Sequence, residues 1–202
     1  MQHNPTFLFS LAISPDPRII GLVRDIKQLL QKRLGRSYRS VNSQAHITLF
    51  TFWATLDDYP GILAKIKAIL AGLESFELKF SGFAFFPPHP LRTFYIQLEE
   101  LSGQKIIKCC DGIHSHVDTD FRKKYSWNNE VKKSPHMSIG HELLESEIPD
   151  CNHLAKRGFI DSSICNSFVI RRFNKSKGQY DILDTIPLLG HQYIAGEQLR
   201  LF

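Results

Sequence analysis

Of the nine histidines in the sequence, only two are followed two positions later by serine or threonine, in His46-Ile47-Thr48-Leu49 and His136-Met137-Ser138-Ile139. On a β-strand, alternate side chains share a face, so each histidine and its hydroxyl would point one way and the apolar residues the other. The two polar positions would be roughly 7 Å apart at the backbone, which lets one phosphate contact both side chains. We therefore expect the apolar residues to face the core, and the imidazoles and hydroxyls to face a groove.

Two such strands facing each other would surround one phosphorus atom with two imidazoles and two hydroxyls. In-line cleavage of a phosphodiester needs a base at the attacking oxygen and an acid at the leaving oxygen, and histidine suits both roles because its ordinary pKa is about 6.5. Each proton transfer is worth roughly 10²–10⁴ in rate, and the hydroxyls would stabilise charge on the non-bridging oxygens. A single motif of this kind is weak evidence, but the pair predicts catalytic His46 and His136 with phosphate-binding Thr48 and Ser138, and no metal.

The elements that must position these residues alternate between hairpins and helices. Apolar periodicity predicts strands over about 6–13, 46–54, 76–86, 92–99, 136–142, 164–173 and 179–186, and helices over about 17–34, 57–73, 102–123 and 147–157. This order favours an α+β fold over a parallel doubly wound sheet. The absence of a linker rich in proline, glycine or serine favours a single domain over 1–202.

The composition limits the class of protein. The chain has 202 residues, 43% hydrophobic and 22% charged, and this excludes a disordered tail, a fibre and a coiled coil. Its 25 basic residues against 20 acidic ones fit an anionic partner such as a nucleotide or RNA end, although many proteins without such a partner carry as much charge. No apolar stretch reaches the roughly 18 residues of a membrane span. The apolar segment 7–13 is interpreted as a strand and not a signal peptide, because no basic residue precedes it.

The four cysteines show no C-x-x-C spacing, which favours a reduced, cytoplasmic chain without a zinc site. A metal site at His114, His116 and Asp118 is a second hypothesis, because three ligand-type residues alternate there. On the helix that we expect, residues two apart do not share a face, so this hypothesis is disfavoured.

Three further residues are candidates for substrate binding. Tyr38 and Trp127 lie in polar loops before the two motifs, where they could stack on a base. The alternative is a solvated loop with only the tryptophan buried. Arg92 begins a strand and could reach the phosphate, although a surface position is more ordinary for an arginine. Arg171 and Arg172 are neighbours on a strand, so at most one of them faces the cleft.

The alternation also extends beyond each motif. Phe50 would continue the face of His46 and Thr48, and Gly140 takes the matching place after Ser138. One side of the cleft would then be aromatic and the other open.

The paired motifs resemble those of the 2H phosphoesterase superfamily, particularly its 2'-5' RNA ligase and cyclic phosphodiesterase branch. Other segments are similar as well: Phe85-Phe86-Pro87 through Arg92-Thr93-Phe94-Tyr95-Ile96, Ser134-Pro135-His136, and a closing hairpin with Phe168-Val169-Ile170, Tyr180-Asp181-Ile182-Leu183 and Pro187-Leu188. The resemblance implies a bilobal α+β fold in which two pseudo-symmetric antiparallel sheets with flanking helices surround a central cleft. Each lobe would bring one motif to that cleft.

The resemblance also implies an activity: metal-independent hydrolysis of 2',3'-cyclic phosphates of nucleotides or RNA ends, or reversible 2'-5' joining of RNA ends, without a cofactor. By analogy, His136 would activate the nucleophile and His46 would protonate the leaving oxygen, while Thr48 and Ser138 hold the phosphate. Position 141 is histidine where many relatives carry a basic residue. We expect a monomer whose partner is a nucleotide or RNA terminus. The alternative is an RNA-binding module with a phosphate-binding cleft and little catalysis.

Overall fold

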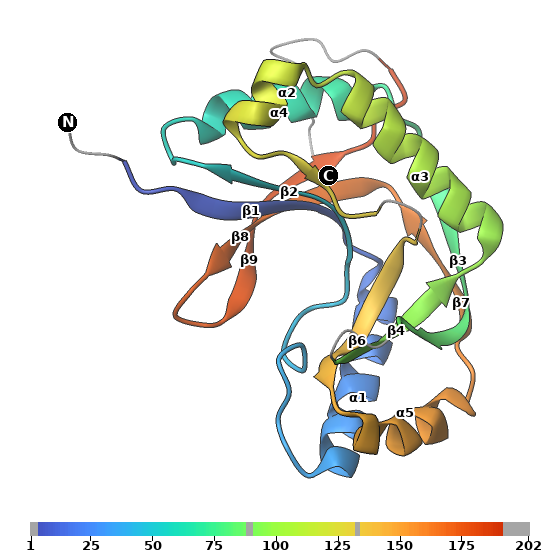
Figure 1. Cartoon of the computed structure of the whole chain (residues 1–202). Helices are drawn as coiled ribbons and strands as arrows, with labels where there is room; N and C mark the ends of the chain where they lie inside the picture. The colour runs from blue at the N-terminus through green and yellow to red at the C-terminus, as the bar shows by residue number, and fades with distance from the viewer. Residues whose placement is uncertain (1–3, 88–90, 132–133, 192–202) are drawn as a thin grey trace.

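Two antiparallel sheets form the frame of the protein in the computed structural model, which describes residues 4–87, 91–131 and 134–191 (Figure 1). The first sheet has the order β5-β2-β1-β8-β9, with β1 Phe7–Ile13, β2 Ile47–Ala54, β5 Asn128–Asn129, β8 Ser167–Asn174 and β9 Gln179–Pro187. The second has the order β6-β4-β3-β7, with β3 Phe76–Phe85, β4 Arg92–Leu98, β6 His136–Leu143 and β7 Ile160–Cys165. The expected bilobal α+β fold is confirmed.

The helices are divided between the two sheets (Figure 1). They are α1 Pro17–Leu34, α2 Tyr59–Ala71, α3 Glu100–Ser115, α4 Thr119–Lys124 and α5 Ile148–Ala155. Helices α2 and α4 lie beside the first sheet, whereas α1 and α5 pack together against the second. Helix α3 begins near β3 and ends with His114 stacked on Phe50 of β2, so it spans both lobes.

The connection from β1 to α1 crosses from the first lobe to the second. Asp16 caps its start by accepting a hydrogen bond from the Ile19 amide at 2.9 Å, and Pro17 takes the first helical position. The Asp16 amide donates to the Ser163 hydroxyl of β7 at 2.9 Å. The chain therefore leaves β1 of the first sheet and is anchored at once to the second.

The expected elements differ from the observed ones in three places. The helix expected over 102–123 is two helices, because Asp118 accepts from the Phe121 amide at 2.7 Å and so begins α4 anew. The strand expected over 164–173 is two strands, β7 and β8, which turn at Asn166 and belong to different sheets. The short strand β5 was also not expected.

Buried aromatic and aliphatic side chains form one continuous cluster that includes residues of both sheets. In the first lobe Phe9 stacks on Phe52 with ring centroids 5.3 Å apart, and in the second Phe83 stacks on Phe94 at 5.1 Å. Such pairs add to the stabilisation from buried apolar area. The four cysteines are free thiols, and in the described ranges no helix has the length and apolar character to cross a membrane.

Candidate active site

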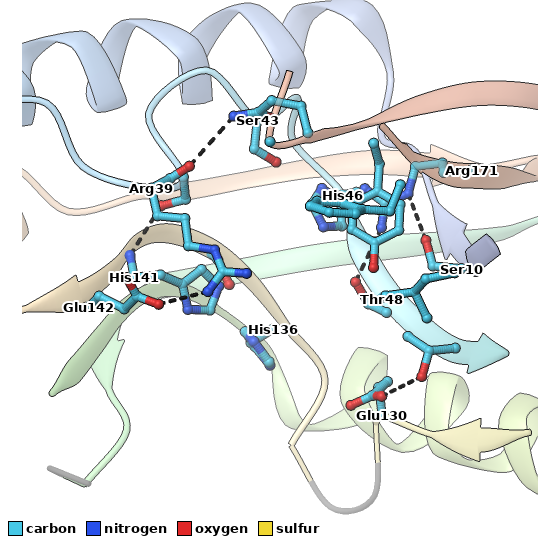
Figure 2. A pocket seen from close by; sticks show the side chains of 18 of the residues that line it. Ser10, Arg39, Ser43, His46, Thr48, Glu130, His136, His141, Glu142 and Arg171 are labelled. Carbon is cyan, nitrogen blue, oxygen red and sulfur yellow. Dashed lines mark hydrogen bonds and ion pairs between the residues drawn. The ribbon is translucent and has the colours of Figure 1, made fainter. Parts of the chain in front are cut away.

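A cleft of about 580 Å³ lies between the two lobes, and both histidine motifs reach it (Figure 2). Most of the residues that line it have polar side chains, and they come from both sheets, from α1 and from the loop before β2. The lining residues are Leu8, Ser10, Lys27, Arg39, Ser40, Ser43, His46, Thr48, Thr51, Glu130, His136, Ser138, His141, Glu142, Arg171, Phe173, Gly178, Gln179 and Tyr180. The structure thus brings His46, Thr48, His136 and Ser138 to one place although 90 positions separate the two motifs.

Burial follows the alternation that the motifs predict. Ile47 and Leu49 on β2, and Met137 on β6, are at most 1% exposed, whereas the polar residues that alternate with them line the cleft: His46, Thr48, His136 and Ser138. Burial of the apolar residues stabilises each strand. Because alternate side chains point to opposite faces, the polar residues of each strand then face the cleft.

The two imidazoles are oriented by equivalent hydrogen bonds to the backbone. The Nδ1–H of His46 donates to the Gln44 carbonyl at 2.6 Å, and that of His136 donates to the Ser134 carbonyl at 3.0 Å. In both cases the acceptor lies two residues before the histidine. With Nδ1 engaged as a donor, Nε2 is the nitrogen of each ring that can exchange a proton with a substrate.

A β-bulge follows Thr48 in β2. Thr48 and Phe50 pair with successive residues of β1, so Leu49 is the extra residue. The bulge resets the alternation: Phe50 turns into the core, and Thr51 takes its place in the cleft. The expectation that Phe50 continues the cleft face is therefore wrong.

The same irregularity occurs at the same place in β6. Ser138 and Gly140 pair with successive residues of β4, so Ile139 is the extra residue there. Gly140 is buried, and His141 lines the cleft with its Nδ1 3.1 Å from the Thr93 hydroxyl. Each motif thus presents three side chains, at the histidine and at the second and fifth residues after it.

Arg171 of β8 is the first cleft residue that the sequence pattern did not single out. Its Nε donates to the Ser10 hydroxyl at 3.1 Å and its Nη2 to the Thr48 hydroxyl at 3.3 Å, and its guanidinium lies 4.9 Å from the centre of the Tyr180 ring. Arg172 lies over Phe7 instead. The sequence indicated only that at most one of these two neighbouring arginines can face the cleft. In the structure, Arg171 is the one that does.

Lys27 is the second unexpected residue. It belongs to α1 and is only 1% exposed, and its Nζ donates to the Ser43 carbonyl at 2.7 Å and the Ser40 carbonyl at 3.1 Å. Burial and the nearby Arg171 cation lower the pKa of Lys27 to about 8. Nothing in the helical pattern distinguishes this lysine from a surface one.

Ser40 joins the two lobes at the cleft. Its hydroxyl donates to the Ile139 carbonyl at 3.0 Å and accepts from the His141 amide at 3.1 Å. The loop that leads to His46 is thereby tied to the bulge of β6. Lys27 holds the same loop from the opposite side, so both motifs depend on this segment for their relative position.

The cleft disfavours protonated imidazole. Burial and the Arg171 cation hold the pKa of His46 well below its ordinary value, and burial lowers the pKa of His136. Burial, together with neighbouring His136 and Lys27, lowers the pKa of His141 to about 4. Without a bound anion, these rings are therefore neutral near pH 7.

The three further candidates for substrate binding lie outside the cleft lining. Tyr38 is 5% exposed and donates its hydroxyl proton to the Lys27 carbonyl, so it braces the loop from inside. Trp127 is buried and stacks on Phe50 with ring centroids 4.8 Å apart. Arg92 pairs with Glu145 at 2.7 Å on the surface. Tyr38 and Trp127 are held by packing in the core, and Arg92 is held by an ion pair. Local sequence does not reveal either kind of contact.

The residues of the metal hypothesis have separate partners. His114 packs against Phe50, His116 bonds to the Gly112 carbonyl through Nδ1, and Asp118 caps α4. Among the residues that the structure describes, no group of three or more His, Cys, Asp or Glu side chains could hold a metal ion. This segment therefore does not support a metallohydrolase.

Comparison with known proteins adds a family and a fold. A family model described as the 2'-5' RNA ligase superfamily matches residues 15–164. The structure of TT0787 of Thermus thermophilus is similar with a TM-score of 0.67 at 15% identity, covering 92% of this chain and 100% of that one. E. coli LigT complexed with 3'-AMP is similar with a TM-score of 0.60 at 12% identity, covering 91% of this chain and 99% of that one. No curated protein sequence matches this chain.

Proposed function

Since the chain belongs to the 2'-5' RNA ligase superfamily of 2H phosphoesterases, we propose that it is a metal-independent phosphodiesterase that hydrolyses 2',3'-cyclic phosphates of nucleotides or RNA ends. Family membership supports phosphodiesterase-type chemistry in general. One observation carries the finer proposal: His46 and His136, each held through Nδ1 by the carbonyl two residues earlier, line one cleft together with Thr48 and Ser138.

In the proposed mechanism, the cyclic phosphate lies between the two motifs. The Nε2 of His136 takes a proton from water as the water oxygen attacks phosphorus. One of the two ribose P–O bonds breaks, and the Nε2 of His46 delivers a proton to the departing ribose oxygen. Each transfer supplies roughly 10²–10⁴ in rate. If the 5'-hydroxyl of a second RNA end takes the place of water, His136 would accept its proton as it attacks phosphorus. The P–O3' bond would break, His46 would protonate the departing 3'-oxygen, and the two ends would be joined by a 2'-5' bond.

The hydroxyls of Thr48 and Ser138 donate to the non-bridging oxygens, where charge accumulates in the transition state. Because the non-bridging oxygens carry more negative charge in the transition state than in the bound diester, these charge-assisted hydrogen bonds strengthen as the reaction proceeds and favour the transition state over the ground state.

The acid role of His46 requires the substrate's own charge. Burial and the Arg171 cation lower the pKa of His46, and both effects work against a protonated imidazole. A phosphate anion bound between the two groups opposes these effects, because an opposite charge within about 4–6 Å favours the charged form. His46 would thus be protonated when substrate binds.

The ligand class is a nucleotide or RNA terminus that carries a phosphate. E. coli LigT, which shares this fold, has been crystallised with 3'-AMP. A cleft of about 580 Å³ is in the range of small-molecule sites and leaves room for one nucleotide. Since one chain supplies both histidines, we propose that the monomer is active.

The first test is turnover of 2',3'-cyclic nucleotides, measured in EDTA with the wild type, His46→Ala and His136→Ala. We expect wild-type turnover to survive chelation with a bell-shaped pH dependence, and each variant to lose at least about 10²-fold in kcat. Near wild-type turnover by either variant would refute the two-histidine mechanism, and loss of wild-type activity in EDTA would refute metal independence. Salt-dependent RNA binding without any turnover would instead favour the RNA-binding module.

The same variants distinguish the two roles when a p-nitrophenyl phosphodiester replaces the cyclic nucleotide. Its leaving group needs no protonation, so the variant that lacks the acid should lose far less activity on it than on the natural ester. We expect His46→Ala to show this partial recovery and His136→Ala not to show it. The opposite pattern would exchange the roles of the two histidines.

A further inference from the structure

We propose that Arg171 is a phosphate-binding residue of this cleft, whose guanidinium binds one phosphate oxygen directly and orients the Thr48 hydroxyl toward another. The inference deepens the proposed function, since it rests on a phosphate that binds between the two motifs. It adds a binding group that neither motif contains and that comes from β8.

The first argument is a buried charge without a counter-charge. Arg171 is 5% exposed, and in the part of the chain that the structure describes no carboxylate lies within ion-pair distance of it. Glu130 lines the same cleft, but its carboxylate accepts from the Thr51 hydroxyl and the Asn128 amide, both at 2.7 Å. Since burying an unpaired cation is costly, such a group is expected where a ligand supplies the anion.

The second argument is the direction of the hydrogen bonds. A guanidinium has five N–H donors and no acceptor. The Nε–H of Arg171 donates to the Ser10 hydroxyl and one Nη2–H donates to the Thr48 hydroxyl, so further donors remain on the Nη atoms. Arg171 extends toward the centre of the cleft beside His46 and Thr48 (Figure 2). These donors match phosphate oxygens in geometry and in charge.

The third argument concerns Thr48. Because its Oγ1 accepts the Nη2–H of Arg171, its own hydroxyl proton is available to a group other than Arg171, and Thr48 lines the cleft in which the phosphate would bind. Arg171 thereby makes Thr48 a donor for a phosphate oxygen before the substrate arrives. This pre-orientation reduces the rearrangement needed on binding.

Lys27 strengthens the same preference. Its buried ammonium lies close enough to lower the pKa of His46 together with Arg171, and among the described residues no carboxylate pairs with it either. Two buried cations beside one cleft create a positive potential that favours anions over neutral nucleosides.

The test measures the affinity of inorganic phosphate by isothermal titration calorimetry for the wild type, Arg171→Gln and the matched control Arg172→Gln. Both variants lose one positive charge on the same strand, but Arg172 lies over Phe7 and outside the cleft lining. We expect Arg171→Gln to weaken phosphate binding about 10- to 100-fold, and Arg172→Gln to change it less than about twofold. Equal effects of the two variants, or no phosphate binding by the wild type, would overturn the proposal.

Arg171→Lys is the second variant. It still tests the role of Arg171 in phosphate binding if Arg171→Gln does not fold. A lysine keeps the charge but has no planar fork for Ser10 and Thr48 together, so we expect phosphate affinity between those of the wild type and of the glutamine variant. Thr48→Val completes a double-mutant cycle with the arginine substitution. If Arg171 acts through the Thr48 hydroxyl, the two losses are less than additive, whereas full additivity would refute the orienting role.

Failure of this inference differs from failure of the proposed function. If His46→Ala and His136→Ala abolish turnover while Arg171→Gln leaves phosphate affinity and KM unchanged, the phosphodiesterase proposal stands and the role of Arg171 is wrong. If the wild type turns over no cyclic phosphate while Arg171→Gln alone weakens phosphate binding, the anion site stands and the enzymatic proposal is wrong.

Discussion

At the residue scale, two similar motifs have different electrostatic surroundings. His46 and Thr48 lie beside the Arg171 cation, whereas His136 packs edge-on against the rings of Phe86 and Tyr95, with centroids 4.6 and 5.3 Å away. A cation disfavours a protonated neighbour, and an aromatic wall mainly excludes water. The two imidazoles are therefore not equivalent, as general acid–base chemistry at opposite ends of a bond requires.

Replacement of Ser138 tests the role of the motif hydroxyls. Ser138→Ala removes a donor to the phosphate and should lower kcat/KM for a cyclic nucleotide by about 10- to 100-fold. Ser138→Thr keeps the hydroxyl on the same strand and should remain within a few-fold of the wild type. Steady-state kinetics with circular dichroism as a folding control measure both. Equal losses in the two variants would indicate a packing effect rather than loss of the hydroxyl.

At the scale of the elements, two bulges at equivalent places shape the cleft. Each follows the hydroxyl residue of its motif and brings the fifth residue after the histidine, Thr51 or His141, to the cleft face. A regular strand would have placed Phe50 and Gly140 there. The two lobes thus share the position of the bulge as well as the motif that precedes it. Bulges are common beside functional sites, where they redirect side chains.

Gly140→Ala tests how closely β6 is packed at its bulge. A Cβ at this position would lie 2.8 Å from Leu143 Cδ1, and Leu143 is fully buried, so it has little room to move. We expect a loss of about 1–3 kcal/mol in the free energy of unfolding and a lower kcat, because His136 and Ser138 lie on the same strand.

Gly21→Ala is the matched control for that substitution. It lies inside α1, where a Cβ would have no heavy atom within 4 Å beyond its own chain neighbours and helix backbone. We expect a gain of about 0.5–1 kcal/mol in the free energy of unfolding, measured by urea denaturation, and unchanged kinetics. A neutral Gly140→Ala would show that the strand adjusts at no cost.

At the scale of the whole molecule, the two lobes are connected by more than the chain. The hydrophobic cluster includes residues of both sheets, α3 spans them, and Ser40 bridges the loop before His46 to β6. We propose that residues 1–202 fold as a single bilobal domain. Both motifs would then keep their relative position without a ligand, so that the cleft is largely formed before substrate binds.

Stability should depend on pH because the cleft disfavours charged histidine. The pKa of His141 is about 4 in the folded chain, against an ordinary value of 6.5, and those of His46 and His136 are also lowered. Below about pH 6.5 the unfolded chain therefore binds more protons, and stability is lost as the pH falls. His141 alone should cost at most about 2 kcal/mol between pH 7 and pH 5.

Urea denaturation at pH 7 and pH 5 measures this loss. His141→Asn should reduce it, and added phosphate should reduce it as well, because a bound anion favours protonated histidine. An unchanged free energy of unfolding between the two pH values would contradict the lowered pKa values. Coincident transitions by circular dichroism and by fluorescence of Trp53 and Trp127, both in the first lobe, would support one cooperative domain.

The fold class, and the shared strand face of the histidine and hydroxyl in each motif, were predictable from local patterns in the sequence. Alternation along a strand depends only on local backbone geometry, and burial of Ile47 and Met137 then leaves one face for the histidine and its hydroxyl. Helix α1 was likewise predictable from its ends, because Asp16 and Gly35 act on their own neighbours.

The surroundings of those side chains depend on contacts between elements that are distant in sequence. The bulges depend on register with a partner strand, and the choice of Arg171 over Arg172 depends on which face of β8 meets the cleft. Trp127 packs against the first sheet and therefore lies outside the cleft lining. Lys27 lines the cleft because α1, a helix of the second lobe, places it there. These positions depend on contacts between residues that are distant in sequence. A local sequence pattern carries no information about the energies of such contacts.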